Sequence, residues 1–301
     1  MGKQKPKPTV ALIYDFDGTL APGNIQEFDF IPAIKSDKSA FWMENATLSK
    51  DNDADQILTY MYLMLTKARN GGISLKRESF QEFGRKVEFF QGVESWFKLI
   101  NEYGKQQGLN IEHYINSSGL KEMIEGTSIA REFKNIFACS YLYDVDGIAY
   151  WPAVAVDYTT KTQFLFKINK GISSVAENKK INQYVKEADR PVQFKHMIYF
   201  GDGETDVPCM KLIKEKGGHS IAVFTPYNKK KKAIAESLIA DKRVNFVCPA
   251  DYSEGKEIYK VVTTILDKIK ADSDFSNLLE KHKEKAIKDI SDIEANVCES
   301  G

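Results

Sequence analysis

The chain has 301 residues, of which 43% are hydrophobic and 28% charged, a composition typical of a globular protein rather than a disordered one. Its 42 Lys and Arg residues balance 42 Asp and Glu residues, so the formal net charge is zero. This balance argues against a general nucleic-acid-binding protein, which needs excess positive charge against phosphates. It leaves open a small phosphorylated ligand, which a local site can hold.

Targeting signals and cysteine use favour a cytoplasmic protein. No stretch reaches the roughly 20 apolar residues that span a bilayer, so we expect no membrane partner. The segment 1–9 carries three lysines and two prolines, lacks the apolar part of a signal peptide, and is interpreted as a frayed basic leader. The four cysteines form no CxxC pair and no zinc-ligand spacing, and we expect free thiols, mostly buried, in a reducing compartment.

Strand and helix patterns alternate along most of the chain. Short apolar, β-branched runs typical of buried strands occupy 9–16, 110–117, 197–200, 221–224 and 244–248. Helical patterns occupy 93–103, 119–125, 162–172, 180–188, 207–216 and 230–240. The alternation predicts an α/β fold whose parallel sheet is covered by helices on both faces.

Three segments break this alternation. The segment 22–90 contains no convincing strand but predicts helices over 53–67 and 74–90, the second with Ser74 as a plausible N-cap, so we interpret it as an inserted helical cap domain. Tyr141–Tyr158 reads as a hairpin turning at Asp146-Gly147. The last segment, 271–301, is a charged tail, either a solvated helix or partly disordered. The α/β core then comprises 1–21 and 91–270.

Acidic and hydroxyl side chains follow three of the predicted strands. Asp15 and Asp17 end the first strand, Ser117 and Ser118 the second, and Gly201-Asp202-Gly203-Glu204-Thr205-Asp206 follows the third. In an open parallel sheet, ligands bind at the carboxyl ends of the strands. Carboxylates gathered there repel one another unless a cation lies between them, and all-oxygen ligands favour Mg²⁺.

These residues resemble the haloacid dehalogenase superfamily. Asp15-Phe16-Asp17-Gly18-Thr19 is similar to its motif I, DxDGT, and Gly201–Asp206 to its motif IV, GDxxxD. Ser117 and Lys161 resemble motifs II and III, and all four motifs occur in the family's order. The resemblance implies a Rossmann-like three-layer α/β/α core. It also likens the insertion to a type 1 cap, as in phosphoserine phosphatases.

The resemblance further implies hydrolysis of a small phosphomonoester through an aspartyl phosphate. Asp15 is then the nucleophile, and Asp17 is the general acid and base. The resemblance places phosphate-binding roles on Ser117, on backbone N–H groups near Gly119 and Phe16, and on Lys161. Mg²⁺ would be held by Asp15, the backbone carbonyl of Asp17, and Asp202. Asp206 would be a further ligand or would support one.

Several alternatives stay open at this stage. Ser118 competes with Ser117 for phosphate, and Lys167 and Lys170 compete with Lys161. A phosphomutase acting on a sugar phosphate, or a regulatory protein that kept the fold without chemistry, are the other functions considered.

The sequence says less about which substrate is bound than about the reaction. The expected partner is a small phosphorylated metabolite, and the oligomeric state stays undefined. Candidate residues facing the substrate, each more plausibly a solvated charge or part of the core, are Glu27, Phe28, Arg69 and Arg85. We interpret Lys229–Lys232 as a solvated first helical turn rather than a phosphate or RNA site. We expect the hairpin aromatics Tyr141, Tyr143, Tyr150 and Trp151 to cover the core.

Overall fold

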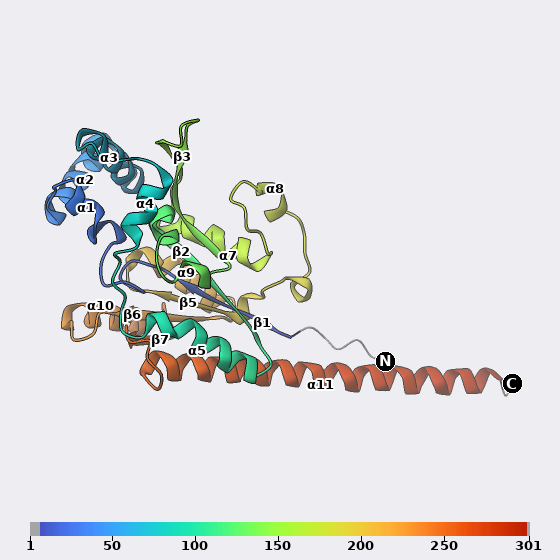
Figure 1. Ribbon diagram of the computed structural model, residues 1–301. Helices are drawn as coiled ribbons and strands as arrows, with labels where there is room; N and C mark the ends of the chain where they lie inside the picture. Colours follow the sequence, from blue (N-terminus) through green and yellow to red (C-terminus); the bar gives the residue numbers. More distant parts are fainter. Residues whose placement is uncertain (1–6, 300–301) are drawn as a thin grey trace.

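A seven-stranded sheet in the order β4-β3-β2-β1-β5-β6-β7 forms the centre of the computed structural model, which describes residues 7–299, with side chains to 291 apart from residue 204 (Figure 1). The expected basic leader therefore lies largely outside the described residues. The strands are β1 (Thr9–Tyr14), β2 (Asn110–Leu120), β3 (Asn135–Tyr143), β4 (Ala149–Val154), β5 (Met197–Gly201), β6 (His219–Phe224) and β7 (Phe246–Pro249).

All neighbouring strands pair in parallel except the edge strand β4, which runs antiparallel to β3. The predicted α/β fold is therefore confirmed. β1 lies at the centre, and its residues from Val10 to Tyr14 are fully buried. Because both faces of this strand are covered, its sequence is a continuous apolar run rather than an alternating one.

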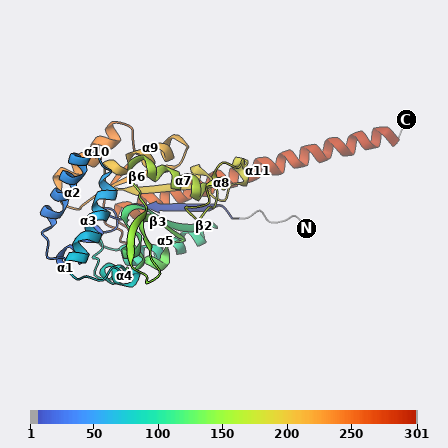
Figure 2. The same ribbon diagram turned by 90° about the horizontal axis from the view of Figure 1, so that it is seen from above.

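Helices cover both faces of the sheet (Figures 1 and 2). On one face lie α5 (Val93–Gln106) and the start of α11 (Glu257–Glu299), which contact each other. On the other lie α7 (Lys161–Asn169), α9 (Val207–Glu215) and α10 (Lys229–Ala240). α5 buries Val93, Trp96, Phe97 and Ile100, the spacing of one apolar helix face.

The segment 22–90, between β1 and α5, is helical as predicted. It contains α1 (Phe30–Ala33), α2 (Lys38–Asn52), α3 (Gln56–Asn70) and α4 (Arg77–Gly84). The side chains of Asp37 and Asp55 accept hydrogen bonds from backbone N–H groups at the starts of α2 and α3. The sequence pattern missed α2. The expected N-cap Ser74 is wrong, because α4 begins after Lys76.

Other helix boundaries also differ from expectation. The helix expected from Gly119 begins only at Lys121, since β2 continues to Leu120, and forms the short α6 (Lys121–Glu125). The helix expected over 180–188 is limited to α8 (Asn178–Ile181) and one turn of 3₁₀-helix, since the side chains there are mostly exposed and no core stabilises a longer helix. The 3₁₀ turns are Ile25–Glu27, Ala130–Glu132, Tyr158–Thr160, Glu187–Asp189, Phe194–His196 and Glu204–Asp206.

The charged segment after 270 continues α11, and its described side chains are mostly exposed, which agrees with the solvated helix that the sequence allowed. This helix has 43 residues, and its later part projects away from the rest of the molecule in both views (Figures 1 and 2). The segment contains no Gly or Pro before residue 300 and is rich in good helix formers, so nothing local ends the helix. In the part of the chain that the structure describes, no helix combines the length and apolar content needed to cross a bilayer.

The predicted hairpin joins β3 and β4. Gly147 in its turn has a φ of +74°, a conformation that favours glycine, and the Asp144 carboxylate accepts hydrogen bonds from the N–H groups of Asp146 and Ile148. Tyr141 is buried as expected, but Tyr150 and Trp151 are exposed, so the expectation that they cover the core is wrong. The free thiols Cys139, Cys209 and Cys248 are buried, as predicted.

Candidate active site

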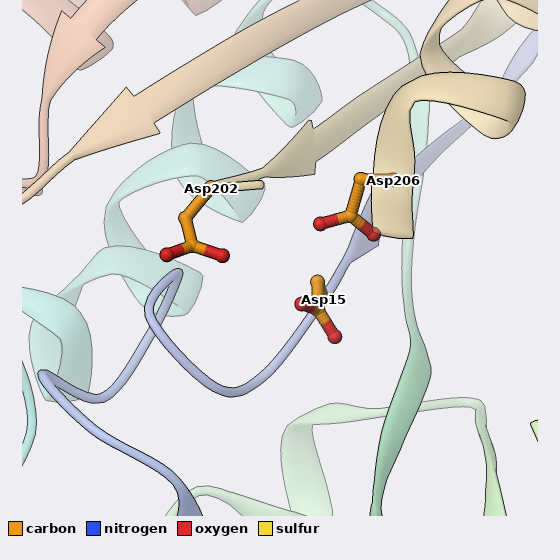
Figure 3. Close-up of side chains that lie close together, drawn as sticks. All are labelled: Asp15, Asp202 and Asp206. Carbon is orange, nitrogen blue, oxygen red and sulfur yellow. The ribbon is translucent and has the colours of Figure 1, made fainter. Parts of the chain in front are cut away.

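Three carboxylates meet where the central strands end (Figure 3). Asp15 follows β1, Asp202 follows the neighbouring β5, and Asp206 ends the turn that leads into α9. Each offers an oxygen within 4.8 Å of the others. Asp15 and Asp206 are buried, while Asp202 is partly accessible. The strand order thus brings residues 187 to 191 positions apart onto one crevice, as the position of the motifs predicted.

A glycine makes this approach possible. Gly18, in the turn after β1, has a φ of +72°, which side chains other than glycine rarely adopt. A Cβ atom built at this position would lie 2.1 Å from Oδ2 of Asp202. Any larger residue would therefore push the Asp202 carboxylate out of the crevice.

Lys161 provides the buried positive charge. It is the first residue of α7, and its Nζ lies 3.1 Å from Oδ1 of Asp15 and 2.7 Å from Oδ1 of Asp206. Tyr199 also donates a hydrogen bond to Oδ1 of Asp206 at 2.7 Å. Burial lowers the pKa of Lys161, but Asp15 and Asp206 outweigh it and the net pKa is raised, so this lysine carries a full charge.

The competing lysines lie elsewhere. Lys167 donates to the backbone carbonyls of Ser174 and Val175, and Lys170 to those of Ile181 and Gln183. Among the three candidates, only Lys161 contacts the carboxylates.

The environment of Asp15 and Asp17 disfavours their charged forms. Burial raises the pKa of Asp15, Asp206 raises it further, and Lys161 lowers it. Burial likewise raises the pKa of Asp17 to about 7, although the N–H of Ile25 donates to its Oδ1 at 2.8 Å and counteracts the shift. A carboxyl group that titrates near neutrality suits proton transfer.

The two candidate serines occupy different positions. Both lie in β2, where its pairing with β3 is irregular. Ser117 is fully buried, and its Oγ accepts a hydrogen bond from the N–H of Gly119 at 3.0 Å. Ser118 lines the cavity, and its Oγ has no hydrogen-bond partner among the described residues. The structure thus places the alternative serine on the cavity wall.

The donor set fits a divalent cation. Oδ2 of Asp206 is buried and has no hydrogen-bond partner among the described residues, and Oδ1 of Asp15 is paired only with Lys161. Unsatisfied buried carboxylate oxygens are costly, and hard cations such as Mg²⁺ prefer oxygen ligands. Asp15, Asp202 and Asp206 could hold such an ion. The Asp17 side chain lies outside this cluster.

A cavity of about 500 Å³ opens beside the carboxylates. Its lining residues come from the turn after β1, the α2–α3 region, β2, the loop before α7 and the loop after β5: Asp15, Asp17, Asn24, Ser49, Ala54, Gln56, Ile57, Ser118, Asp157, Tyr158, Asp202 and Thr205.

The four substrate-facing candidates, Glu27, Phe28, Arg69 and Arg85, are outside this lining. Glu27 accepts a hydrogen bond from Trp42, Arg69 donates to a backbone carbonyl in β4, and Arg85 pairs with Glu82. The interpretation of these residues as solvated charges or parts of the core therefore agrees with the structure.

Sequence reasoning missed Lys231. Its Nζ lies 2.9 Å from Oδ2 of Asp202, so the Lys229–Lys232 turn is not wholly solvated as expected. The available signal was its position, because α10 follows β6 and begins at the carboxyl edge of the sheet. Tyr199, Asp157 and Tyr158 were also missed. Tyr199 reads as an ordinary core residue of a strand, and the loop residues carry no motif.

Comparison with known proteins places the chain in a family. The family model for haloacid dehalogenase-like hydrolases matches residues 12–211, which include every residue of the carboxylate cluster. The chain belongs to the haloacid dehalogenase-like hydrolases. An uncharacterized protein of Borreliella burgdorferi is 31% identical over 274 residues, covering 83% of this chain and 94% of that protein.

Solved structures agree with this haloacid dehalogenase fold. A substrate-bound phosphoserine phosphatase superposes with a TM-score of 0.51 at 14% identity, covering 87% of this chain and 99% of that one. A phosphoserine phosphohydrolase-like protein from Francisella tularensis subsp. tularensis SCHU S4 gives a TM-score of 0.45 at 19% identity, covering 79% and 94%. The first of these likenesses shows the fold.

Proposed function

We propose that this haloacid dehalogenase-like hydrolase is a Mg²⁺-dependent phosphatase of small phosphomonoesters. The observation that carries the proposal is the meeting of Asp15, Lys161, Asp202 and Asp206 beside a cavity of about 500 Å³. A buried carboxylate that lines a cavity and is held by a lysine is a positioned nucleophile.

Two neighbouring acids divide the chemistry. An oxygen of Asp15 attacks phosphorus, the bond to the leaving oxygen breaks, and Asp17 gives that oxygen a proton. Water then attacks the acyl phosphate, Asp17 takes back a proton, and phosphate leaves Asp15 unchanged. General acid–base catalysis of this kind contributes about 10²–10⁴-fold.

Polar groups around Asp15 stabilise the transferring phosphoryl group. Lys161 offsets its negative charge, and the hydroxyl of Ser117 or Ser118 and the N–H groups near Gly119 and Phe16 donate to its oxygens. Asp15, Asp202 and the Asp17 backbone carbonyl, with Asp206 as a ligand or as support, would hold Mg²⁺. The bound ion supplies the positive charge that lets an anionic nucleophile approach an anionic substrate.

The helical segment 22–90 acts as the cap in this proposal. Ser49, Ala54, Gln56 and Ile57 contribute to the cavity wall opposite the carboxylates. A cap over the cavity excludes water from the first step, in which Asp15 rather than water must attack phosphorus.

Hydrolysis of p-nitrophenyl phosphate with and without Mg²⁺ tests the proposal. We expect EDTA to abolish turnover and Asp15→Asn to lower kcat by about 10³-fold or more, because the amide cannot form the acyl phosphate. Asp17→Asn should lower kcat by about 10²–10⁴-fold. Asp146→Asn, in the exposed hairpin turn, is the matched control and should leave turnover unchanged.

Full turnover in EDTA or in Asp15→Asn would contradict the mechanism. Conversion of glucose 1-phosphate to an isomer without phosphate release would instead indicate a phosphomutase. No turnover over a broad phosphomonoester panel would favour the regulatory alternative.

A further inference from the structure

The wall of the cavity away from Asp15 determines which alcohol can leave. It is formed by Gln56 and Ile57 at the start of α3, and by Asp157 and Tyr158 in the loop before α7. Among the described residues, no Lys or Arg lines this cavity. The wall therefore offers carboxylate, amide, aromatic and aliphatic groups, but no cation.

The lysines that contact the carboxylates are already paired. Lys161 contacts Asp15 and Asp206, and Lys231 contacts Asp202. Within the helical segment, Lys67 pairs with Glu44 at 2.7 Å and Arg69 donates to a backbone carbonyl. A carboxylate on the leaving group would thus enter the cavity without a cationic partner, which costs binding energy.

The same wall is negatively charged. Asp157 belongs to the capping box before α7, where its Oδ1 accepts a hydrogen bond from Thr160 at 3.0 Å. Its carboxylate also faces that of Asp55: burial raises the pKa of Asp157, Thr160 lowers it and Asp55 raises it further. Asp55 is fixed by the N–H groups of Ile57 and Leu58. Asp157 therefore lines the cavity, and Asp55 lies beside it at the start of α3.

An aromatic ring completes this side. Tyr158 is half exposed, lines the cavity and has a φ of +20°, an uncommon value that the loop imposes. Aromatic faces attract ammonium groups. Asp15, the nucleophile of the proposed reaction, lines the same cavity, so phosphorus must lie beside it. The leaving group therefore shares the cavity with Asp157 and Tyr158.

We propose that the preferred substrate is the phosphomonoester of a small amino alcohol, with its ammonium group bound by Asp157 and Tyr158 and supported by Asp55. This inference rests on the proposed phosphatase function and specifies its substrate class. Esters of hydroxy acids, such as phosphoserine, are disfavoured because their carboxylate meets Asp157 without a compensating cation.

Phosphate release by the full chain with MgCl₂ tests the inference with three substrates: phosphoethanolamine, glycerol 3-phosphate and phosphoserine. We expect kcat/KM for phosphoethanolamine to exceed that for phosphoserine at least tenfold and that for the uncharged glycerol ester several-fold. In Asp157→Asn the ratio of phosphoethanolamine to glycerol 3-phosphate should fall about tenfold. This ratio is taken within one protein, so a general loss of active enzyme does not move it.

A second variant keeps the test independent of the folding of Asp157→Asn. Gln56 is exposed, and its described hydrogen bonds use only its backbone carbonyl. Gln56→Arg adds the missing cation and should raise the phosphoserine-to-phosphoethanolamine ratio about tenfold. The matched control Asp146→Asn should leave both ratios unchanged.

Failure of the inference and failure of the proposed function give different results. If p-nitrophenyl phosphate is hydrolysed, but phosphoserine or glycerol 3-phosphate reaches the same kcat/KM as phosphoethanolamine, the proposed amine site is wrong. The proposed phosphatase function is then unaffected. If no phosphomonoester is hydrolysed, the proposed function itself is wrong, and the inference fails with it.

Discussion

At the scale of single residues, the site is a problem of charge balance. Asp15, Asp17, Asp202 and Asp206 gather at one edge of the sheet, while Lys161 and Lys231 are the cations that contact them. Lys161 is fully buried and bonded on both sides, whereas the Lys231 side chain is 42% exposed and contacts only Asp202. Lys231 therefore contacts Asp202 from the solvent-exposed side, whereas Lys161 pairs with Asp15 and Asp206 inside the protein.

Removing this outer cation should strengthen metal binding. In Lys231→Met, we expect Mg²⁺ to bind several-fold more tightly, because a positive charge 2.9 Å from an Asp202 oxygen no longer repels the ion. Solvent screening of the exposed lysine limits the effect. Isothermal titration calorimetry measures it directly. Lys232→Met, which breaks only a surface pair with Glu236, is the control. Weaker binding in Lys231→Met would mean that the lysine orients Asp202 instead.

At the scale of elements, chain direction decides which residues meet. The parallel strands β1 and β5 end at the same edge of the sheet, which places Asp15 and Asp202 there. α7 begins at Lys161, after the capping box of Asp157 and Thr160. The helices of the insertion start in the same manner, at Asp37 and Asp55. Helix starts thus fix both Lys161 and the cavity wall.

The start of α2 can be tested alone. Asp37 accepts a hydrogen bond from the N–H of Ala40 at 3.1 Å, so Asp37→Ala should lower the free energy of unfolding by about 1 kcal/mol. Urea denaturation measures the change. Asp51→Ala removes the same charge near the other end of α2, where the helix dipole disfavours a carboxylate, and should be neutral or slightly stabilising. Equal losses in the two variants would contradict the capping role.

At the scale of the whole molecule, a polar chain runs through the core beneath the sheet. Trp96 of α5 donates to the Tyr14 hydroxyl at 2.8 Å, and this hydroxyl lies 3.0 Å from Nδ1 of His113 in β2. Tyr14 and Phe97 also pack against the His113 ring. These hydrogen bonds link the central strand β1 to the helix α5 that covers it. Because His113 is buried among these side chains, water could not hydrate its ring in the charged form.

This histidine predicts a pH dependence of stability. Burial lowers the pKa of His113 to about 3, against an ordinary value of about 6.5. Between these values the unfolded chain takes up a proton that the folded chain does not. Stability is therefore full above pH 6.5 and falls as the pH decreases towards 3, by up to about 1.4 kcal/mol per pH unit.

Urea denaturation between pH 7 and pH 4 checks this dependence. His113→Gln should be less stable at pH 7 but should lose less stability on acidification than the unchanged protein. His282→Gln, on the exposed part of α11, should retain the original slope. Parallel curves for His113→Gln and the unchanged protein would contradict the role of His113.

The sequence by itself determined the α/β class, most of the strands and the motif residues, because these depend on local patterns and on strand direction. The start of β3, before Tyr141, was missed. Continuous apolar runs mark buried parallel strands, and Asp15, Asp17, Lys161 and Asp202 follow strands or begin helices at recognisable spacings. The boundaries of the short helices were missed, and so was α2, whose buried positions, Phe41, Asn45 and Ser49, give no apolar periodicity.

Only the tertiary structure decided the surroundings of these residues. Three features join segments distant in the chain: Lys231 contacts Asp202, Ser118 lies on the cavity wall, and Asp55 lies beside Asp157. Such contacts depend on how the loops and the helices of segment 22–90 pack against the sheet. No periodicity or spacing encodes that arrangement, because it results from packing summed over the whole molecule.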